Sequence, residues 1–460
     1  MRKILAVFAA LILICSCTRI EPSALPTTTA TTTVTTTVTT TTIPETTTVT
    51  TTTTTAPETT TTTAAPETTT VETTTTTVTT TTTPPPETTT VTTTTTPPPE
   101  TTTTAATTTA PAPVIFPTSY NTLNYAEQKG VWISYLEYDS ILKNKTKEQF
   151  TKNIDRAFDN VVSLGFNTVY LQLRAFGDAY YSSALFPAGD RFGSADFDPL
   201  PIMIQSAHDR GLSVHGWINP MRLCTDSQMK NIPADIAYKK WHSAGTSQIF
   251  KHDGRWYLNP DSDEAVNFIV AGIAEIVSNY RVDGIQIDDY FYPDNAPTAA
   301  KIARVNNLVK SINSTVHTAN PDALFGISPQ GNIENNRPLS ADVEEWCKGG
   351  YCDYIVPQIY FGFDNGYSPY LRMISEWSEI STGVKLIIGL APYKIGVYDS
   401  FAKPGVNEWL ESSDILARQI KAAKLLSNYG GVALFRYDSL FNPAADVAAQ
   451  VNAEIENLKK

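Results

Sequence analysis

The sequence is poor in the residues that build metal sites and disulfide frameworks. It has 5 cysteines and 5 histidines in 460 residues, and none of them form a CxxC or HxxxH pair. Ligand spacing therefore predicts neither a metal site nor a cofactor. Cys347 and Cys352 are close enough along the chain to bridge a short loop, but the spacing leaves free thiols equally open.

Two further features are missing, and each excludes a class of protein. The formal net charge is -12 and the chain has no run of lysine and arginine, so nucleic acid and anionic membrane surfaces are not expected partners. No glycine-rich phosphate turn follows the first expected strand, which argues against a doubly wound dinucleotide-binding fold.

The first 22 residues have the pattern of an export signal. Arg2 and Lys3 precede an apolar stretch, residues 4–14, that is too short to span a bilayer. The stretch runs into LICSC, residues 13–17, which resembles a bacterial lipobox except for the cysteine at its third position. We expect cleavage before Cys17, lipid attachment there, and a membrane-anchored protein that projects into the cell wall. An ordinary secretory signal that is cut slightly later is the alternative.

Residues 23–116 form a low-complexity linker of threonine tracts broken by proline, alanine and glutamate. Between residues 27 and 113 it has no aromatic residue and few aliphatic ones, so it cannot bury enough apolar surface to offset the entropy of ordering. We expect a disordered, extended tether that carries a folded domain, residues 117–460, away from the membrane.

The chain beyond residue 116 alternates between short apolar runs and longer amphipathic stretches. Strands are predicted at residues 130–135, 167–174, 213–219, 284–290, 324–330, 354–360, 385–391 and 431–437. Helices are predicted at residues 147–164, 199–210, 261–280, 297–319, 341–347, 369–379, 414–429 and 443–458. Eight strands that are each followed by a helix predict an α/β fold, the (β/α)8 or TIM barrel.

Polar residues recur at every second position near the ends of several predicted strands. This period places them toward the barrel axis, and polar side chains at the C-terminal strand ends mark the catalytic face of such a barrel. A hydrogen-bonded core position explains any one of them, but the whole set favours a site. The set comprises Gln172, Arg174, His215, Trp217, Asn219, Gln286, Asp288, Tyr290, Ser328, Gln330, Gln358, Tyr360, Arg436 and Asp438.

The strongest local signal is the segment DGIQIDDYFYP, residues 283–293. It predicts a strand that ends in two adjacent carboxylates, Asp288 and Asp289, followed by aromatic residues. Acetal hydrolysis needs a carboxylic acid to protonate the leaving oxygen, and a carboxylate or substrate group to stabilise the positive centre. We predict Asp288 and Asp289 as catalytic residues, although Asp289 falls on the other side of the strand and equally suits a loop cap.

A second carboxylate from another strand end is an open alternative. Each candidate taken singly suits a structural role; they are Glu137, Glu334 and Asp438, with Asp139 and Asp178 as further ones. Aromatic residues are abundant near the predicted strand ends, and their rings suit the apolar faces of sugars, although core packing explains several of them. Arg174 and Arg436 are expected to bind an acidic group such as a lactyl substituent, or to pair with a neighbouring Asp.

A series of motifs, taken in order, resembles the glycosyl-hydrolase-like 10 domain of bacterial envelope proteins. The motifs are GVW at 130–132, GFNTVYLQLR at 165–174, GDA at 177–179, HGWINP at 215–220, LNP at 258–260, DGIQIDDYFYP at 283–293, FGISP at 325–329, PQIY at 357–360 and YKIG at 393–396. That family includes a division-site glycosidase that acts on peptidoglycan strands stripped of peptides. The resemblance implies a barrel, glycan hydrolysis and catalysis at the strand end with Asp288 and Asp289.

The same resemblance indicates residues that line the substrate cleft, namely Arg174, Asp178, Asn219, Gln358, Tyr360 and Lys394. The strand pattern adds Trp217, Gln286 and Tyr290 to this substrate-binding set. A weaker likeness to chitinases fails at their DGxDxDxE pattern, where Gln286 and Tyr290 replace an Asp and the terminal Glu. This departure argues against chitinase chemistry, but it leaves open assistance by a substrate acetamido group that Tyr360 or Gln358 orients.

We therefore predict a glycoside hydrolase of cell-wall glycan, with peptide-free peptidoglycan strands as the polysaccharide substrate. Two other functions fit the sequence. One is a non-catalytic carbohydrate-binding barrel, because a second carboxylate is not obvious. The other is a hydrolase of external polysaccharide.

Overall fold

The computed structural model describes residues 120–288 and 291–460. Parallel strands close into a barrel in the order β1-β11-β10-β9-β8-β7-β3-β2. The strands are β1 (Gln128–Ile133), β2 (Thr168–Arg174), β3 (Ser213–Ile218), β7 (Gly284–Asp288), β8 (Leu324–Ser328), β9 (Tyr354–Ile355), β10 (Lys385–Leu390) and β11 (Tyr429–Leu434). The predicted (β/α)8 barrel is confirmed, and every predicted strand overlaps an observed one.

The ring closes where β1 pairs with β11 on one side and β2 on the other. Gly431 makes this seam possible, because its φ is +141° and a Cβ there would lie 1.8 Å from the carbonyl oxygen of Gln128. Gly130 has a related role, since a Cβ at that position would meet the ring of Tyr170 at 2.3 Å. Glycine is thus required at the seam by backbone contact and in the barrel interior by a large neighbouring ring.

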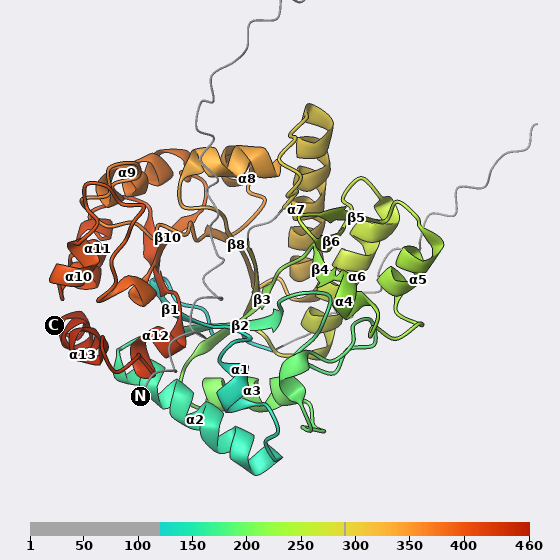
Figure 1. Ribbon diagram of the computed structural model, residues 1–460, viewed down its shortest axis with the longest axis horizontal. Helices are drawn as coiled ribbons and strands as arrows, with labels where there is room; N and C mark the ends of the chain where they lie inside the picture. Colours follow the sequence, from blue (N-terminus) through green and yellow to red (C-terminus); the bar gives the residue numbers. More distant parts are fainter. Residues whose placement is uncertain (1–119, 289–290) are drawn as a thin grey trace, which may run out of the picture. The chain divides into compact units, whose positions relative to one another are not determined.

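Helices surround the barrel, as Figure 1 shows. The longer ones are α2 (Lys147–Ser163), α3 (Pro199–His208), α6 (Asp263–Asn279), α7 (Ala299–Ala319), α9 (Tyr370–Ile380), α11 (Ile415–Ala423) and α13 (Ala448–Leu458), and the short ones are α1 (Tyr138–Ile141), α8 (Val343–Lys348), α10 (Glu408–Glu411) and α12 (Tyr437–Phe441). Helix α2 illustrates the local cause. Thr146 and Gln149 form a capping box at its start, and its buried residues, from Phe150 to Val161, recur at helical spacing on one face.

A small antiparallel sheet interrupts the repeat after β3. It contains β4 (Arg222–Thr225), β5 (Ile249–His252) and β6 (Arg255–Leu258) in the order β4-β6-β5, with α4 (Asp226–Met229) and α5 (Ala237–Ala244) between β4 and β5. We did not predict this sheet. Its hairpin carried a recognisable signal, because Asp253 and Gly254 both have positive φ between β5 and β6, as an Asp-Gly turn requires.

The barrel axis is filled by rings and by polar groups that bond to one another. Trp132, Tyr170, Trp217 and Tyr354 belong to one buried cluster. His215 is fully buried beside them, with its Nδ1 2.6 Å from the hydroxyl of Tyr354, and burial lowers its pKa to about 4. The imidazole is therefore neutral near pH 7 and serves as a core hydrogen-bonding group.

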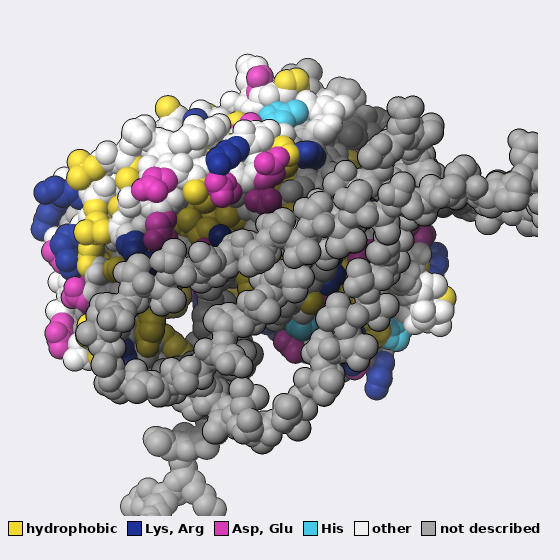
Figure 2. Space-filling view, turned by 90° about the horizontal axis from the view of Figure 1, so that it is seen from above, with side chains coloured by type: hydrophobic (Ala, Val, Ile, Leu, Met, Phe, Trp, Pro, Cys, Tyr) yellow, Lys and Arg dark blue, Asp and Glu magenta, His cyan; other side chains and the backbone are white. Residues whose placement is uncertain are grey.

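The state of the cysteines, the absence of a membrane-spanning helix and the surface charge are properties of the described residues as a whole. Cys224, Cys347 and Cys352 are buried free thiols, so the last two form no disulfide. No helix in the described ranges is both long enough and apolar enough to cross a membrane. On the face seen in Figure 2, basic and acidic side chains are interspersed.

Candidate active site

Asp288 ends strand β7 at the C-terminal face of the barrel, and it is 7% exposed. The indole Nε1–H of Trp217 donates to its Oδ2 at 3.0 Å, and the amide Nδ2–H of Asn219 donates to its Oδ1. Both partners come from β3 and the residue after it, next to β7 in the sheet. Two N–H donors suit a carboxylate that accepts hydrogen bonds, which is the role of the ionised form. Asp289 and Tyr290, which we also predicted at this site, lie outside the described residues.

A hydrogen-bond chain extends from this carboxylate to the first two strands. Gln172 donates from Nε2 to Oδ1 of Asn219 at 2.8 Å, and its Oε1 accepts from the backbone N–H of Tyr135 at 3.0 Å. The chain fixes which way the Asn219 amide faces, because its oxygen is held by Gln172 and its nitrogen is left to donate to Asp288. Gln172 is thus a positioning residue that joins the ends of β1, β2 and β3.

Gln286 lies one layer deeper in the barrel. It is fully buried, and its Oε1 accepts from the indole Nε1–H of Trp132 at 2.9 Å. Its Nε2 has no hydrogen-bond partner among the described residues. Gln286 therefore belongs to the polar layer below Asp288, and its contacts are with the barrel interior.

Aromatic rings surround Phe435, which follows β11 at the same face. Ring centroids of Trp132, Trp217, Tyr360 and Tyr393 lie 6.1, 6.2, 5.7 and 6.1 Å from that of Phe435. The cluster runs from Trp217, which bonds Asp288, out to Tyr393, which is 43% exposed. It provides an apolar wall beside the carboxylate, and a sugar ring can stack on such a wall.

Phe435 was not predicted at the site, because the sequence pattern of the last strand, residues 431–437, placed Arg436 and not Phe435 on the side that faces the barrel axis. Ala433 belongs to the cluster in the barrel interior, and Phe435, two residues later, packs against that cluster. Arg436 instead makes an ion pair with Glu137, in the loop after β1. Arg436 also lies 3.6 Å from Asp438, so pairing with neighbouring acidic residues, the second role expected of it, is confirmed.

The predicted second-carboxylate candidates have protein partners that favour structural roles. Glu137 is fully buried and also bonds Ser134 and the backbone N–H of Asp438, and burial is the main reason that its pKa is raised. Asp438 lies 3.6 Å from Arg436 and accepts from Asn442 at 2.6 Å. Glu137 and Asp438 therefore anchor the loop after β11 to the loop after β1.

The side chains of Glu334 and Asp139 are more exposed to solvent than that of Glu137. The side chain of Glu334 is 66% exposed and lies 3.3 Å from Arg337, in the η2 turn (Ile333–Leu339). Asp139 pairs with Lys143 and Arg191, both at 3.2 Å. Both carboxylates are therefore engaged in exposed ion pairs with neighbouring basic residues.

The chain matches the family described as glycosyl hydrolase-like 10 over residues 127–302 and 294–405. It belongs to that family. Glycosyl hydrolase YngK of Bacillus subtilis (strain 168) is 32% identical over 330 residues, which cover 61% of this chain and 63% of that protein. Glycosyl hydrolase DigH of Escherichia coli (strain K12) is 29% identical over 385 residues, which cover 70% of this chain and 85% of that protein. The chain thus spans less than two thirds of the Bacillus relative.

Among solved structures, the glycoside hydrolase domain of PgaB (BpsB) from Bordetella bronchiseptica aligns with 71% of this chain and 99% of its own length. The sequence identity is 12% and the TM-score is 0.49.

One residue of the family motif, Arg174, lies outside the barrel interior, contrary to our prediction. The pairing of β2 with β3 shifts register between Gln172 and Arg174, so the alternation breaks there. The Arg174 guanidinium lies 3.6 Å from the ring centre of Phe186, and a Cβ at Gly272 of α6 would lie 2.6 Å from its Nη1. It is fully buried, burial lowers its pKa, and its three nitrogens have no hydrogen-bond partner among the described residues. Arg174 packs in the helical layer and does not line the face at Asp288.

The other predicted substrate-binding residues of the family motifs have local partners. Asp178 accepts from the backbone N–H of Phe176 at 2.9 Å, and its pKa is raised to about 6, chiefly by burial. Lys394 donates to Asp399 at 2.6 Å. Gln358 donates to the backbone carbonyl of Ser328 at 3.3 Å. The first two contacts order their own loops, and Gln358 ties the end of β8 to the segment after β9.

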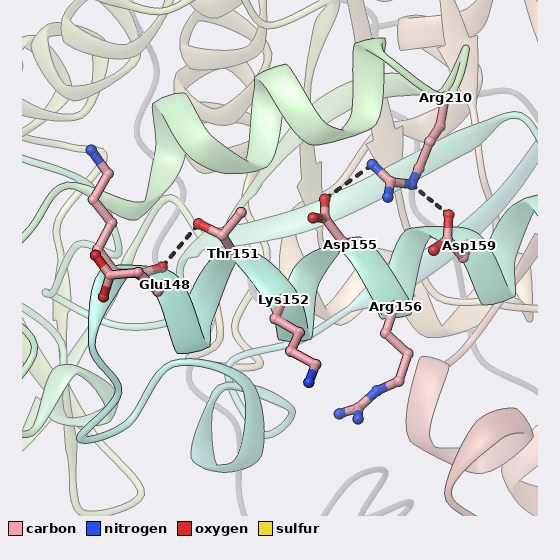
Figure 3. Close-up of a pocket in the computed structure, with 8 residues that line it drawn as sticks. Glu148, Thr151, Lys152, Asp155, Arg156, Asp159 and Arg210 are labelled. Carbon is pink, nitrogen blue, oxygen red and sulfur yellow. Dashed lines mark hydrogen bonds and ion pairs between the residues drawn. The ribbon is translucent and has the colours of Figure 1, made fainter.

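A hollow of about 800 Å³ lies elsewhere, along helix α2 in the outer layer. Figure 3 shows that Arg210 pairs with two of its acidic residues, Asp155 at 3.0 Å and Asp159 at 2.6 Å. Its lining comes from α2 and from Arg210, which follows α3. It is therefore separate from the strand ends that carry Asp288. Within the described ranges, no group of three or more His, Cys, Asp or Glu residues is arranged to hold a metal ion.

Proposed function

We propose that this protein is a glycoside hydrolase of cell-wall glycan, and that its substrate is the peptidoglycan strand after its peptides have been removed. The observation that carries the proposal is Asp288, a carboxylate held by two N–H donors at a strand end, next to a wall of aromatic rings. Membership of the glycosyl hydrolase-like 10 family supports the class of reaction, and so do two relatives that are both named glycosyl hydrolase.

In the proposed reaction Asp288 supplies negative charge. Its carboxylate either stabilises the oxocarbenium-like centre or attacks it, and the donors from Trp217 and Asn219 hold it in place. A second, protonated carboxyl must deliver a proton to the leaving oxygen, and Asp289 is our candidate for it. If the acetamido group of the substrate acts as the nucleophile instead, Asp288 orients that group and Tyr360 stacks on the sugar.

The test is hydrolysis of peptide-free glycan strands by the wild type and by Asp288→Asn and Asp289→Asn. We expect each substitution to lower kcat/KM by about 10²- to 10⁴-fold, the usual range for a lost acid or base. Released saccharides are separated by chromatography and identified by mass spectrometry. Glu376→Gln is a matched control, because it removes a carboxylate from an exposed helical ion pair with Arg372.

The same experiment separates the other functions. Binding of strands without any release of saccharide would identify a carbohydrate-binding barrel. Release from plant or starch-like polymers alone would identify a hydrolase of external polysaccharide. Equal rates for wild type and Asp288→Asn would refute catalysis by Asp288.

We also propose that the domain is tethered to the cell membrane by lipid on Cys17, which places it at the cell wall. The supporting feature is the lipobox-like sequence at residues 13–17, followed by the threonine-rich linker. Cys17→Ala should move the protein from the membrane fraction to the soluble fraction and abolish labelling by a radioactive fatty acid. Labelling that persists in the variant would contradict the assignment.

A further inference from the structure

Exposed aromatic side chains lie on the two loops that follow β9 and β10. Tyr367 in the first loop is 63% exposed, and Tyr398 and Phe401 in the second are 55% and 73% exposed. Both loops leave the C-terminal ends of their strands, which is the face of the barrel that carries Asp288. Single exposed apolar residues are common on protein surfaces, but several rings on neighbouring loops indicate a surface that binds a ligand or a partner.

Hydrogen bonds join the two loops, at the side of the barrel that carries α9 and α10 (Figure 1). The backbone N–H of Gly366 donates to the carbonyl of Ala402 at 3.3 Å. These two residues are the chain neighbours of Tyr367 and Phe401, so the exposed rings of the two loops come from adjoining stretches of backbone. The carboxylate of Glu408, in α10, also accepts from two backbone N–H groups of the first loop, at 2.8 and 2.9 Å. The two loops therefore form one unit.

The second loop is also fixed to the ring wall of the candidate active site. Tyr393 lies near the start of this loop, and its ring centroid is 6.1 Å from that of Phe435. The next residue, Lys394, donates from Nζ to Oδ2 of Asp399 at 2.6 Å, and Oδ1 of Asp399 accepts from the backbone N–H of Phe401 at 3.2 Å. Asp399 thus connects the backbone of the most exposed ring to the residue beside Tyr393. The exposed rings therefore continue outward from the wall beside the catalytic carboxylate.

We propose that Tyr367, Tyr393, Tyr398 and Phe401 form an outer ring surface that binds the sugars of a long glycan chain beyond those held at Asp288. The inference rests on the proposed function and deepens it, because it makes long strands better substrates than short fragments. Ring faces suit the apolar C–H faces of sugars, and tyrosine hydroxyls both donate to and accept from sugar hydroxyls. Continuity with the wall at the carboxylate favours a glycan chain over a second protein as the occupant.

The test measures how affinity depends on chain length. Peptide-free glycan tetrasaccharides and octasaccharides are titrated by calorimetry into Asp288→Asn protein, in which turnover is slowed. The same ligands are titrated into Asp288→Asn protein that also carries Tyr398→Ser and Phe401→Ser, and into one that carries Phe401→Trp, which keeps a ring. Leu425→Ser is the matched control, because Leu425 is an 85% exposed apolar residue that precedes β11, at the opposite end of the barrel.

We expect Asp288→Asn protein to bind the octasaccharide about 10- to 100-fold more tightly than the tetrasaccharide, the range for two or three ring contacts. The two serine substitutions should remove most of this preference and leave tetrasaccharide binding intact, which also shows that the variant is folded. Phe401→Trp and Leu425→Ser should retain the preference. Equal or absent binding of the two lengths by the parent protein would overturn the outer ring surface, as would a preference that survives both serine substitutions. Sedimentation that shows a dimer of the wild type and a monomer of the serine variant would also overturn it, because the rings would then join two copies of the chain.

Failure of the outer ring surface and failure of the proposed function give different results. If protein with Asp288 intact hydrolyses both lengths with the same kcat/KM, before and after the two serine substitutions, the enzyme proposal stands and the outer ring surface is refuted. If no strand is hydrolysed but length-dependent binding requires Tyr398 and Phe401, the outer ring surface stands and the proposed hydrolysis is refuted.

Discussion

The hydrogen bond from Trp217 to Asp288 leads to a sharp prediction about pH dependence. Trp217→Phe keeps an aromatic ring in the cluster around Phe435 but removes the N–H that donates to Asp288 at 3.0 Å. A hydrogen bond to a charged group contributes about 1.5–3 kcal/mol, and each 1.4 kcal/mol is about a factor of ten, so protonation of Asp288 should become roughly 10- to 100-fold easier.

The sign of the effect follows from which form the donor stabilises. The N–H favours the ionised carboxylate, so its loss extends the protonated, inactive form to higher pH. The acid limb of the kcat/KM profile on peptide-free glycan should therefore move up by about one to two pH units. At a pH above the new limb, the variant should recover most of the wild-type rate.

Trp132→Phe is the matched control. That indole also packs on Phe435, but its N–H donates at 2.9 Å to Gln286 and not to Asp288. It should lower stability without moving the acid limb. A Trp217→Phe profile that keeps the wild-type limb, or equal movement in both variants, would refute the idea that Asp288 acts as an ionised acceptor.

Two further predictions concern stability. Gly431→Ala should destabilise the barrel by roughly 3–5 kcal/mol in urea unfolding, because its Cβ would meet the Gln128 carbonyl at 1.8 Å with φ at +141°. Gly245→Ala is the control, since Gly245 also has a positive φ but a Cβ there would have no neighbour within 4 Å, and it should cost about 1 kcal/mol. Equal losses of stability in the two variants would contradict the closure geometry at Gly431. Burial lowers the pKa of His215 from 6.5 to about 4 in the folded protein. As the pH falls, the imidazole is therefore protonated in the unfolded chain before it is protonated in the folded one, and the free energy of unfolding decreases between pH 6.5 and pH 4. His215→Gln should remove roughly 3 kcal/mol of that acid sensitivity, and an unchanged slope of unfolding free energy against pH would show that His215 does not titrate in this way.

Polar residues in the barrel interior divide into two functional layers. His215 and Gln286 bond to rings inside the barrel, where Tyr354 and Trp132 are their partners. Asn219 and Gln172, nearer the strand ends, instead bond in a line that ends on Asp288. The deeper layer satisfies buried groups and stabilises the core, whereas the upper layer orients a carboxylate.

The barrel itself could be predicted because its signals are local. A run of alternating or continuous apolar residues defines each strand, and a capping residue such as Thr146 begins a helix whatever the rest of the chain does. The strand end at Asp288 was predicted for the same reason, since the run from Gly284 to Asp288 is continuous and buried throughout. The small sheet with Asp253 and Gly254 was missed because short strands of four residues carry little periodicity.

The sequence by itself therefore determined the order of strands and helices, and placed Asp288 at the end of its strand. Only the tertiary structure decided which side chains share the site. A register shift sends Arg174 into the helical layer, and the phase of β11 puts Phe435, not Arg436, beside Trp217. Glu137 is held by Arg436, 299 residues away, and the two arginines that lie over the ring of Phe176, Arg222 and Arg255, come from strands that meet only in the folded sheet. Periodicity reports on neighbours a few residues apart, whereas these contacts depend on where distant strands end and how they are registered.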